Sequence, residues 1–153
     1  MRILIQRVKR ASVNIDGKVN GEIKHGLLAF VGFCEGDKKE YIIPMAQKLA
    51  GLRIFEDENE KMNLSVADVD GDILAISQFT LYADCSHGRR PSFIGALKPD
   101  VAEEYYNIFV KTLGEITGKQ IPTGIFGADM KVELLNDGPV TVMLDSCDII
   151  KNK

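Results

Sequence analysis

Apolar and polar residues alternate along the first part of the chain, which is the pattern of β-strands that bury one face. Residues 3–8 alternate in this way and predict a first strand. Residues 11–15 and 18–23 flank Asp16-Gly17, a dipeptide typical of the type I′ turn of a β-hairpin. The sequence therefore predicts a strand followed by a hairpin.

The next segment changes from alternation to a continuous apolar run. Residues 26–33 are apolar throughout and predict a buried central strand. Asp37 followed by Glu40 is the pattern of a capping box and predicts a helix that reaches about Leu52. Pro44 conflicts with an unbroken helix, so the regular helix either begins near Pro44, in its first turn, or kinks there.

Strand patterns return in the middle of the chain. Residues 53–55 and 62–64 are expected to form short strands on either side of an acidic turn at 56–61. Residues 73–82 predict one long strand. Residues 84–91 then form a polar loop that contains a glycine and a proline.

A second helix is predicted after Pro99-Asp100, with Asp100 and Glu103 as a capping pair and Gly118 at its end. Its predicted buried face repeats at helical spacing and consists of Val101, Tyr105, Ile108, Phe109, Thr112, Leu113 and Ile116.

Three further strands are expected at 121–126, 130–135 and 140–144, with Asn136–Pro139 as a tight turn between the last two. Strands and helices do not alternate regularly along the chain. We therefore expect a single α+β domain over residues 1–153, with a mainly antiparallel sheet that forms a barrel-like core, closed or nearly closed, and two main helices.

Composition agrees with a globular protein, because 45% of the residues are hydrophobic and 27% are charged. No apolar run approaches the roughly 20 residues of a membrane helix. Basic residues interrupt the apolar N-terminal segment, so no signal peptide is expected and a cytoplasmic location is predicted. The net charge of −3 argues against general affinity for nucleic acids.

The cysteines and histidines do not form a recognisable catalytic or metal-binding pattern. Cys34, Cys85 and Cys147 are an odd number without CxxC spacing, so a disulfide framework is not expected. With only His25 and His87 in addition, neither a metal site nor a cofactor is predicted. A nucleophilic pair of Cys85 and His87 remains an alternative, although no third group that would orient the pair is evident.

Polar residues interrupt the predicted long strand at Ser77–Thr80. Strand alternation would place Ser77 and Phe79 on one face and Gln78 and Thr80 on the other. Two interpretations stay open. The hydroxyl and amide groups satisfy backbone groups within the sheet, or they form a polar notch that binds a ligand, with Phe79 offering a flat face to a base.

Eight short motifs occur along nearly the whole chain: Gln6-Arg7-Val8, Gly26-Leu27-Leu28, Leu52–Asp57, Lys61-Met62-Asn63, Ser77–Leu81, Arg90–Phe93, Thr123–Met130 and Asn136–Thr141. In their order and spacing, these motifs resemble the bacterial and eukaryotic type of D-aminoacyl-tRNA deacylase. The chain departs from the family in having Arg89 where asparagine is more common, and Pro44 is unusual in the first helix.

The resemblance implies a homodimeric hydrolase that needs no cofactor and cleaves the ester between a D-amino acid, or glycine, and tRNA. It also implies that the substrates are D-aminoacyl-tRNA and glycyl-tRNA and that the role is chiral proofreading in translation quality control. By the same resemblance, Ser77–Thr80 of one subunit and a cis Gly138-Pro139 step of the other are expected to form the site. Backbone amides near Phe79 and Thr80 would then stabilise the oxyanion, and the Gly-Pro carbonyls would hold the substrate ammonium.

The resemblance also suggests roles for further residues, some of which have two alternatives. Thr80 is either a nucleophile or an orienting group, and the second role is preferred because no base lies beside it in the sequence. Arg7 is expected to hold the Gly-Pro segment, and Met130 either lines the pocket or belongs to the core. Arg89 and Arg90 either meet tRNA phosphates or are solvated surface. A non-catalytic nucleic-acid-binding module and a purely structural dimer are the rival functions.

Overall fold

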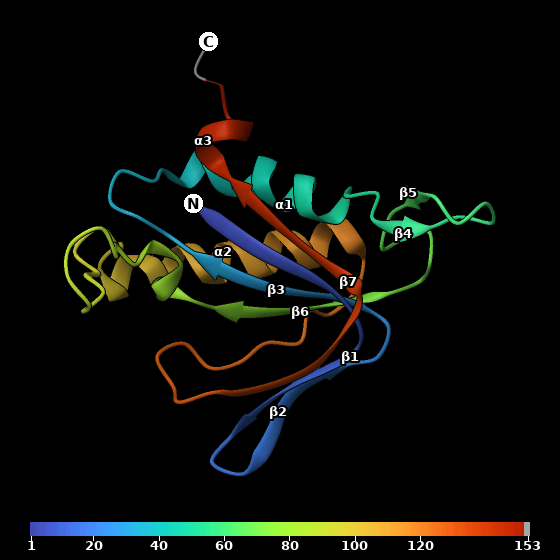
Figure 1. Ribbon diagram of the computed structural model, residues 1–153, viewed down its shortest axis with the longest axis horizontal. Helices are drawn as coiled ribbons and strands as arrows, with labels where there is room; N and C mark the ends of the chain where they lie inside the picture. The colour runs from blue at the N-terminus through green and yellow to red at the C-terminus, as the bar shows by residue number, and fades with distance from the viewer. Residues whose placement is uncertain (152–153) are drawn as a thin grey trace.

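The computed structural model describes residues 1–151 and shows a curled mixed sheet, a half-barrel, with helices over one side (Figure 1). In the main sheet the order is β2-β1-β3-β6, and β7 pairs with the other edge of β1. Among the described strands of this sheet, β3 and β6 pair in parallel and the other pairs are antiparallel. The predicted α+β class with a mainly antiparallel, barrel-like sheet is confirmed. The strands of this sheet are β1 (Arg2–Ile15), β2 (Lys18–Ile23), β3 (Gly26–Gly32), β6 (Asp72–Ser77) and β7 (Lys131–Asp145).

Strand β1 organises the sheet because it contacts three other strands. Its first half pairs with β3, its second half pairs with β2, and β7 runs along its other edge. The predicted first strand and hairpin arm are thus one continuous strand. Asp16 and Gly17 have φ values of 51° and 75°, as the predicted type I′ turn requires.

The core has two parts on opposite sides of the sheet. The larger part joins the sheet to α1 (Ile42–Ala50) and α2 (Pro99–Thr117), and the smaller part lies within the curl toward β2. In β3 the odd positions Leu27, Ala29 and Val31 belong to the larger part, and Leu28 belongs to the smaller. This strand is buried on both faces, which confirms the prediction from its continuous apolar run.

The start of α1 differs from the predicted capping box. A 3₁₀ turn at Lys39–Tyr41 precedes the helix, and Pro44 lies in the first turn of α1, the first of the two alternatives. Asp37 does not cap the helix. Its carboxylate accepts a hydrogen bond from the Cys34 amide at 2.8 Å and pairs with the Met1 ammonium, and these local partners compete with a capping role.

Helix α2 begins at Pro99, two residues earlier than predicted, and buries a rotated face. Pro99 is its first residue, so Asp100 lies inside the first turn and the predicted capping pair of Asp100 and Glu103 is wrong. Gly118, at φ 67°, ends the helix as predicted. Ile116 is 41% exposed, and the buried positions are Ala102, Tyr106, Phe109 and Leu113.

Shorter elements complete the described chain. The predicted short strands appear as the ribbon β4 (Phe55–Glu56) and β5 (Met62–Leu64). The strand predicted at 121–126 is wrong, since only Thr123 forms a bridge, to Ala75 of β6, between Pro122 and Gly124. A short helix that was not predicted, α3 (Ser146–Ile149), is capped by the Asp145 carboxylate.

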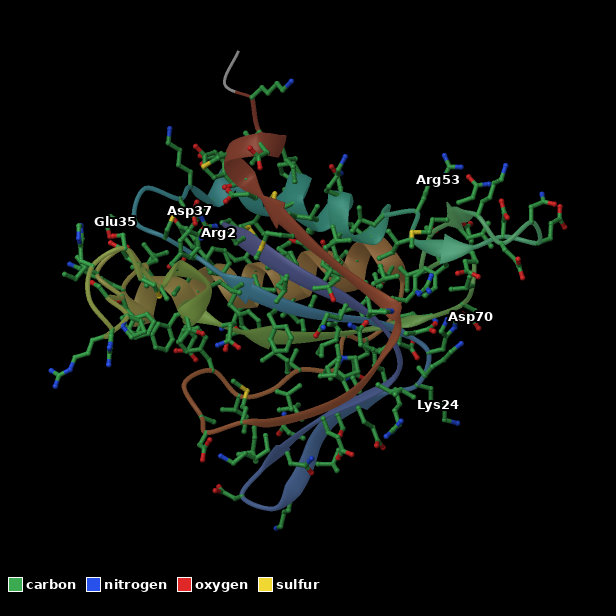
Figure 2. The ribbon with its side chains drawn as sticks, viewed as in Figure 1. Arg2, Lys24, Glu35, Asp37, Arg53 and Asp70 are labelled. Atoms are coloured by element: carbon green, nitrogen blue, oxygen red, sulfur yellow. The ribbon has the colours of Figure 1, made fainter. Side chains whose placement is uncertain are left out.

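Charged side chains cover the outside of the sheet and helices, including Lys24, Glu35, Arg53 and Asp70 (Figure 2). Within residues 1–151, no helix is long and apolar enough to cross a membrane. Cys34, Cys85 and Cys147 are all free thiols.

Candidate active site

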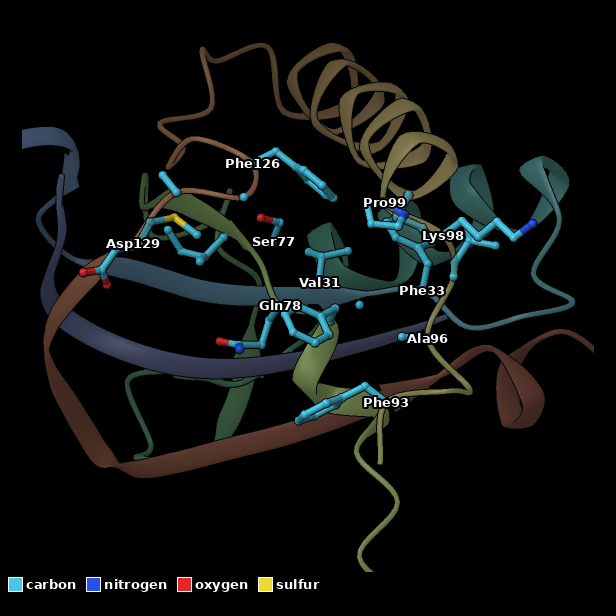
Figure 3. Close-up of a pocket in the computed structure, with 18 of the residues that line it drawn as sticks. Val31, Phe33, Ser77, Gln78, Phe93, Ala96, Lys98, Pro99, Phe126 and Asp129 are labelled. Atoms are coloured by element: carbon cyan, nitrogen blue, oxygen red, sulfur yellow. The ribbon is translucent and has the colours of Figure 1, made fainter. Parts of the chain in front are cut away.

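A cavity of about 620 Å³ opens where the parallel strands β3 and β6 end. The carboxyl ends of parallel strands are common ligand sites, because the chain leaves the sheet there and makes room for a pocket. The first turn of α2 and the loop at 126–130 form the other walls. Figure 3 shows Ser77 and Val31 between Phe126 on one side and Phe93 on the other.

The Ser77–Thr80 motif lies at this opening, but only Ser77 belongs to the strand. The Gln78 amide still donates to the Val31 carbonyl at 2.8 Å, and then the chain turns into a 3₁₀ helix at Phe79–Tyr82. The predicted strand over 73–82 is therefore wrong beyond Ser77. Strand β3 ends at Gly32 and offers no further ladder partners, and the helical bond from the Ala83 amide to the Thr80 carbonyl replaces them.

The helical turn changes the direction of the motif's side chains. Strand alternation no longer relates Phe79 to Ser77, and Phe79 is 56% exposed. Its ring packs edge-on against Phe93, with centroids 5.1 Å apart. The side-chain amide of Gln78 donates to the hydroxyl of Thr80. The site thus presents an aromatic pair at its mouth and a hydrogen-bonded pair beside it.

The cavity contains few ionisable groups. Among its described lining residues, only Lys98 and Asp129 ionise, and both are exposed. Figure 3 shows the Lys98 ammonium directed away from the cavity, and Asp129 pairs with Lys131 at 2.8 Å. Burial, assisted by Cys34, raises the pKa of nearby Tyr82, which stays neutral. The cavity is therefore better suited to binding a ligand and polarising it with backbone groups than to acid–base catalysis by side chains.

The Asn136–Pro139 segment is not the predicted tight turn, because β7 continues through it without reversing. Gln6 pairs with Thr141 and Val8 pairs with Asn136, so the intervening residues of β7 bulge out opposite Arg7. Such bulges aim backbone groups away from the ladder. The Gly138-Pro139 peptide bond is cis, and both residues are exposed.

Arg7 contacts this bulge from β1. Its guanidinium donates to the Asp137 carbonyl at 3.2 Å and to the Ile54 carbonyl at 2.8 Å, and it lies 3.7 Å from the Glu56 carboxylate. Arg7 is only 5% exposed. A buried guanidinium of this kind requires such partners, because an unpaired charge there would be costly.

Within one chain, the bulge and the cavity lie at opposite ends of β3. Val31 pairs with Ser77 at the cavity end, whereas Leu27 pairs with Arg7 beside the bulge. These rows are four residues apart, or about 13 Å along the strands. The cavity reaches Val132 near the start of β7, whereas the bulge lies in the middle of that strand.

Of the remaining predicted residues, Met130 lines the cavity and Arg89 and Arg90 do not. Met130 also packs against the smaller core cluster, so both sequence interpretations describe it. Arg89 and Arg90 are exposed on a loop closed by paired hydrogen bonds between Asp84 and Ser92, next to Phe93. Their contact with tRNA stays a prediction.

Sequence reasoning missed several lining residues. Phe93 and Phe126 lie within quoted motifs, and their place in those motifs was the available signal. Lys98 and Pro99 belong to the start of α2 and had no local signal, since only the fold brings them to the cavity. Among the described residues, no group of three or more His, Cys, Asp or Glu side chains could hold a metal ion.

Comparison with solved structures defines the class of fold. A structure described as "c-Myc DNA Unwinding Element Binding Protein" matches with a TM-score of 0.88 and 38% identity, over 95% of this chain and 98% of that chain. Another, described as a probable eukaryotic D-amino acid tRNA deacylase, shares the fold with a TM-score of 0.81 at 17% identity, over 94% of this chain and 97% of that chain.

Sequence comparison then identifies the family. Residues 4–145 match the family described as D-Tyr-tRNA(Tyr) deacylase. The chain is 54% identical to a D-aminoacyl-tRNA deacylase of Halothermothrix orenii and 55% identical to one of Flavobacterium johnsoniae, each over 95% of this chain and 97% of the relative. The chain belongs to the D-Tyr-tRNA(Tyr) deacylase family.

Proposed function

We propose that this protein is a cytoplasmic D-aminoacyl-tRNA deacylase that acts in translation quality control. It hydrolyses the ester between a D-amino acid, or glycine, and the terminal adenosine of tRNA, and it spares L-aminoacyl-tRNA. The observation that carries the proposal is the family match over residues 4–145, which includes both site motifs. Relatives of the same name align over 95% of the chain.

The chemistry of the substrate suits a cavity with few ionisable groups. An aminoacyl ester is already activated, and the neighbouring ribose hydroxyl assists its hydrolysis. The protein must then position the ester and stabilise the oxyanion. The amides of Phe79 and Thr80 begin a 3₁₀ helix, where the first N–H groups have no partner within the helix. We assign the oxyanion to these amides and a base-stacking role to the exposed ring of Phe79.

Chiral selection is proposed to come from a second copy of the chain. Gly138 and Pro139 are exposed and lie far from the cavity of their own chain, so a homodimer is needed to bring the two motifs together. The Gly-Pro carbonyls of the partner would hold the substrate ammonium and leave no space where an L side chain projects. A D side chain or the hydrogen of glycine would meet no obstruction.

The deciding experiment compares D-tyrosyl-tRNA with L-tyrosyl-tRNA as substrates of the purified protein. We expect rapid hydrolysis of the D ester and a rate on the L ester that equals its spontaneous hydrolysis. Equal rates on both esters, or hydrolysis of neither, would contradict the proposal.

A binding module without catalysis is the second candidate. It is favoured by one observation: the solved structure that is 38% identical carries a name that describes DNA binding. It predicts affinity for RNA or DNA that falls steeply with salt, without ester cleavage. Salt-dependent binding combined with no hydrolysis of D-tyrosyl-tRNA would support this second function instead.

Replacing Thr80 with alanine tests whether its hydroxyl is a nucleophile. We expect kcat on D-tyrosyl-tRNA to fall about five- to tenfold, the effect of losing one hydrogen bond of about 1 kcal/mol, because the hydroxyl only accepts from Gln78. Single-turnover kinetics would measure the change, with Thr80→Ser as the control that retains the hydroxyl. Loss of nearly all catalysis in Thr80→Ala, with activity retained in Thr80→Ser, would identify a covalent nucleophile instead.

A further inference from the structure

The Phe79–Tyr82 helix rests on a row of cross-strand neighbours at one end of the sheet. Arg2 of β1 pairs with Gly32 of β3 and with Asp145 of β7. One position earlier, Val31 pairs with Ser77, the last residue of β6. Asp145, Arg2 and Gly32 therefore form a cross-strand row that lies next to the end of β6, where the 3₁₀ helix begins.

Arg2 connects this row to the helix through its guanidinium. Nε donates to the Asp145 carboxylate at 2.8 Å, and Nη1 donates to the Leu81 carbonyl at 3.0 Å. The guanidinium carbon also lies 4.6 Å from the centre of the Tyr82 ring, in cation–π geometry. One side chain thus holds two of the four residues of the helix.

Gly32, the cross-strand neighbour of Arg2, packs against the same helix. A Cβ atom at this position would lie 2.6 Å from the Gln78 carbonyl oxygen and 3.2 Å from the Cβ of Leu81. The helix therefore packs directly against the backbone of β3, and only glycine permits this approach. The contact limits how the helix shifts toward the sheet, and Arg2 limits how it moves away.

The charge and exposure of the Arg2–Asp145 pair indicate that it positions the helix more than it stabilises the fold. A hydrogen bond from Arg2 to Asp145 raises the pKa of Arg2. Burial raises the pKa of Asp145, but hydrogen bonds from Arg2 and the Cys147 amide outweigh burial and lower it. The pair is therefore fully charged at neutral pH. Its side chains are 39% and 19% exposed, and pairs this accessible contribute little to folding.

We propose that Arg2, oriented by Asp145, is a positioning residue for the active site, because it fixes the helix that carries Phe79 and Thr80. The link to catalysis rests on the proposed deacylase function. Arg2 itself does not line the cavity. Its effect on the reaction would therefore pass through Leu81 and Tyr82 to the backbone amides at the start of the helix.

Arg2→Met tests this proposal with two independent measurements. Amide hydrogen exchange at Leu81 and Ala83, whose amides bond within the helix, is expected to accelerate about tenfold or more. The kcat on D-tyrosyl-tRNA is expected to fall about ten- to hundredfold, since small misplacements of a site cost that much, while KM changes less than about twofold. Thermal melts would first show that each variant is folded at the assay temperature.

Lys119→Met is the matched control, because Lys119 also joins a carboxylate to a carbonyl. Its ammonium donates to Asp72 and to the Gly71 carbonyl, each at 3.1 Å, at the opposite end of β6. Exchange at Leu81 and Ala83 and the kcat are expected to stay at wild-type values in this variant.

Arg2→Lys and Asp145→Asn provide milder changes if Arg2→Met does not fold. Lysine keeps the charge but cannot reproduce the fork that reaches Asp145 and Leu81 together, so a partial loss of kcat is expected. Unchanged exchange at Leu81 and Ala83 in the Arg2 variants would overturn the proposal. If the wild-type protein does not hydrolyse D-tyrosyl-tRNA, the deacylase function fails, and the exchange measurement alone decides whether Arg2 positions the helix.

Discussion

Replacing Arg7 with methionine is expected to lower the free energy of unfolding by about 3 kcal/mol, the typical cost of breaking a buried charged contact from one side. The side chain of Arg7 is 6% exposed, and its loss would leave the carbonyls of Ile54 and Asp137 without these donors. An unsatisfied buried carbonyl costs roughly 1–3 kcal/mol, and methionine fills space without supplying a hydrogen bond. Urea unfolding followed by circular dichroism would measure the change.

Lys9→Met is the control for the Arg7 substitution. Lys9 pairs with the Asp137 carboxylate at 3.4 Å, as Arg7 does at 3.5 Å, but the side chain of Lys9 is 58% exposed. We expect a loss below about 0.5 kcal/mol, because exposed ion pairs contribute little. Similar losses in both variants would show that charge near Asp137, rather than the buried hydrogen bonds of Arg7, stabilises the bulge.

Elements whose patterns depend on local sequence could be predicted well. A continuous apolar run predicts the central strand β3, and the dipeptide Asp16-Gly17 predicts the hairpin turn. Gly118 ends α2 because glycine readily adopts the left-handed conformation found there. In each case the residues that determine the structure lie within the element.

Elements that depend on distant partners could not be predicted in this way. Apolar residues recur at Phe79, Leu81 and Tyr82 and predict that the strand continues. However, β3 ends at Gly32, so the ladder stops and the chain turns into a 3₁₀ helix. Asn136–Pro139 has the composition of a turn, yet continued pairing with β1 on both sides keeps it within β7. The residue types typical of turns predict the local backbone conformation, but they do not predict whether the chain reverses its direction.

The candidate site shows the same division. The polar interruption at Ser77–Thr80 is visible in the sequence, and the family resemblance adds Gly138 and Pro139. The cavity wall from α2 and the contact between Arg2 and Leu81 span large sequence separations. No pattern in the sequence around Arg2 indicates that its guanidinium reaches the site helix, and the cross-strand register is what brings the two together.

Replacing Gly138 with alanine is expected to abolish most activity on D-tyrosyl-tRNA, with a loss of about a hundredfold or more. Gly138 has φ of 126°, a conformation that L-residues rarely adopt. A Cβ atom there would lie 2.8 Å from the Val140 side chain and 3.1 Å from Nη2 of Arg7. The bulge would have to move, which would misplace the carbonyls proposed to hold the substrate ammonium. Steady-state kinetics on the D ester would measure the loss.

Gly36→Ala is the control for Gly138→Ala. It introduces backbone strain without displacing the bulge, so it distinguishes these two effects. Gly36 also has a positive φ, 89°, but a Cβ atom there meets nothing within 4 Å. We expect this variant to lose about 1–2 kcal/mol of stability from the unfavourable conformation and to keep wild-type kcat and KM. Gly138→Ala should lose activity at temperatures where both variants are folded, because its added methyl group contacts Arg7 and Val140. Full activity in Gly138→Ala would exclude the bulge from the reaction and, with it, the proposed contribution of a second subunit.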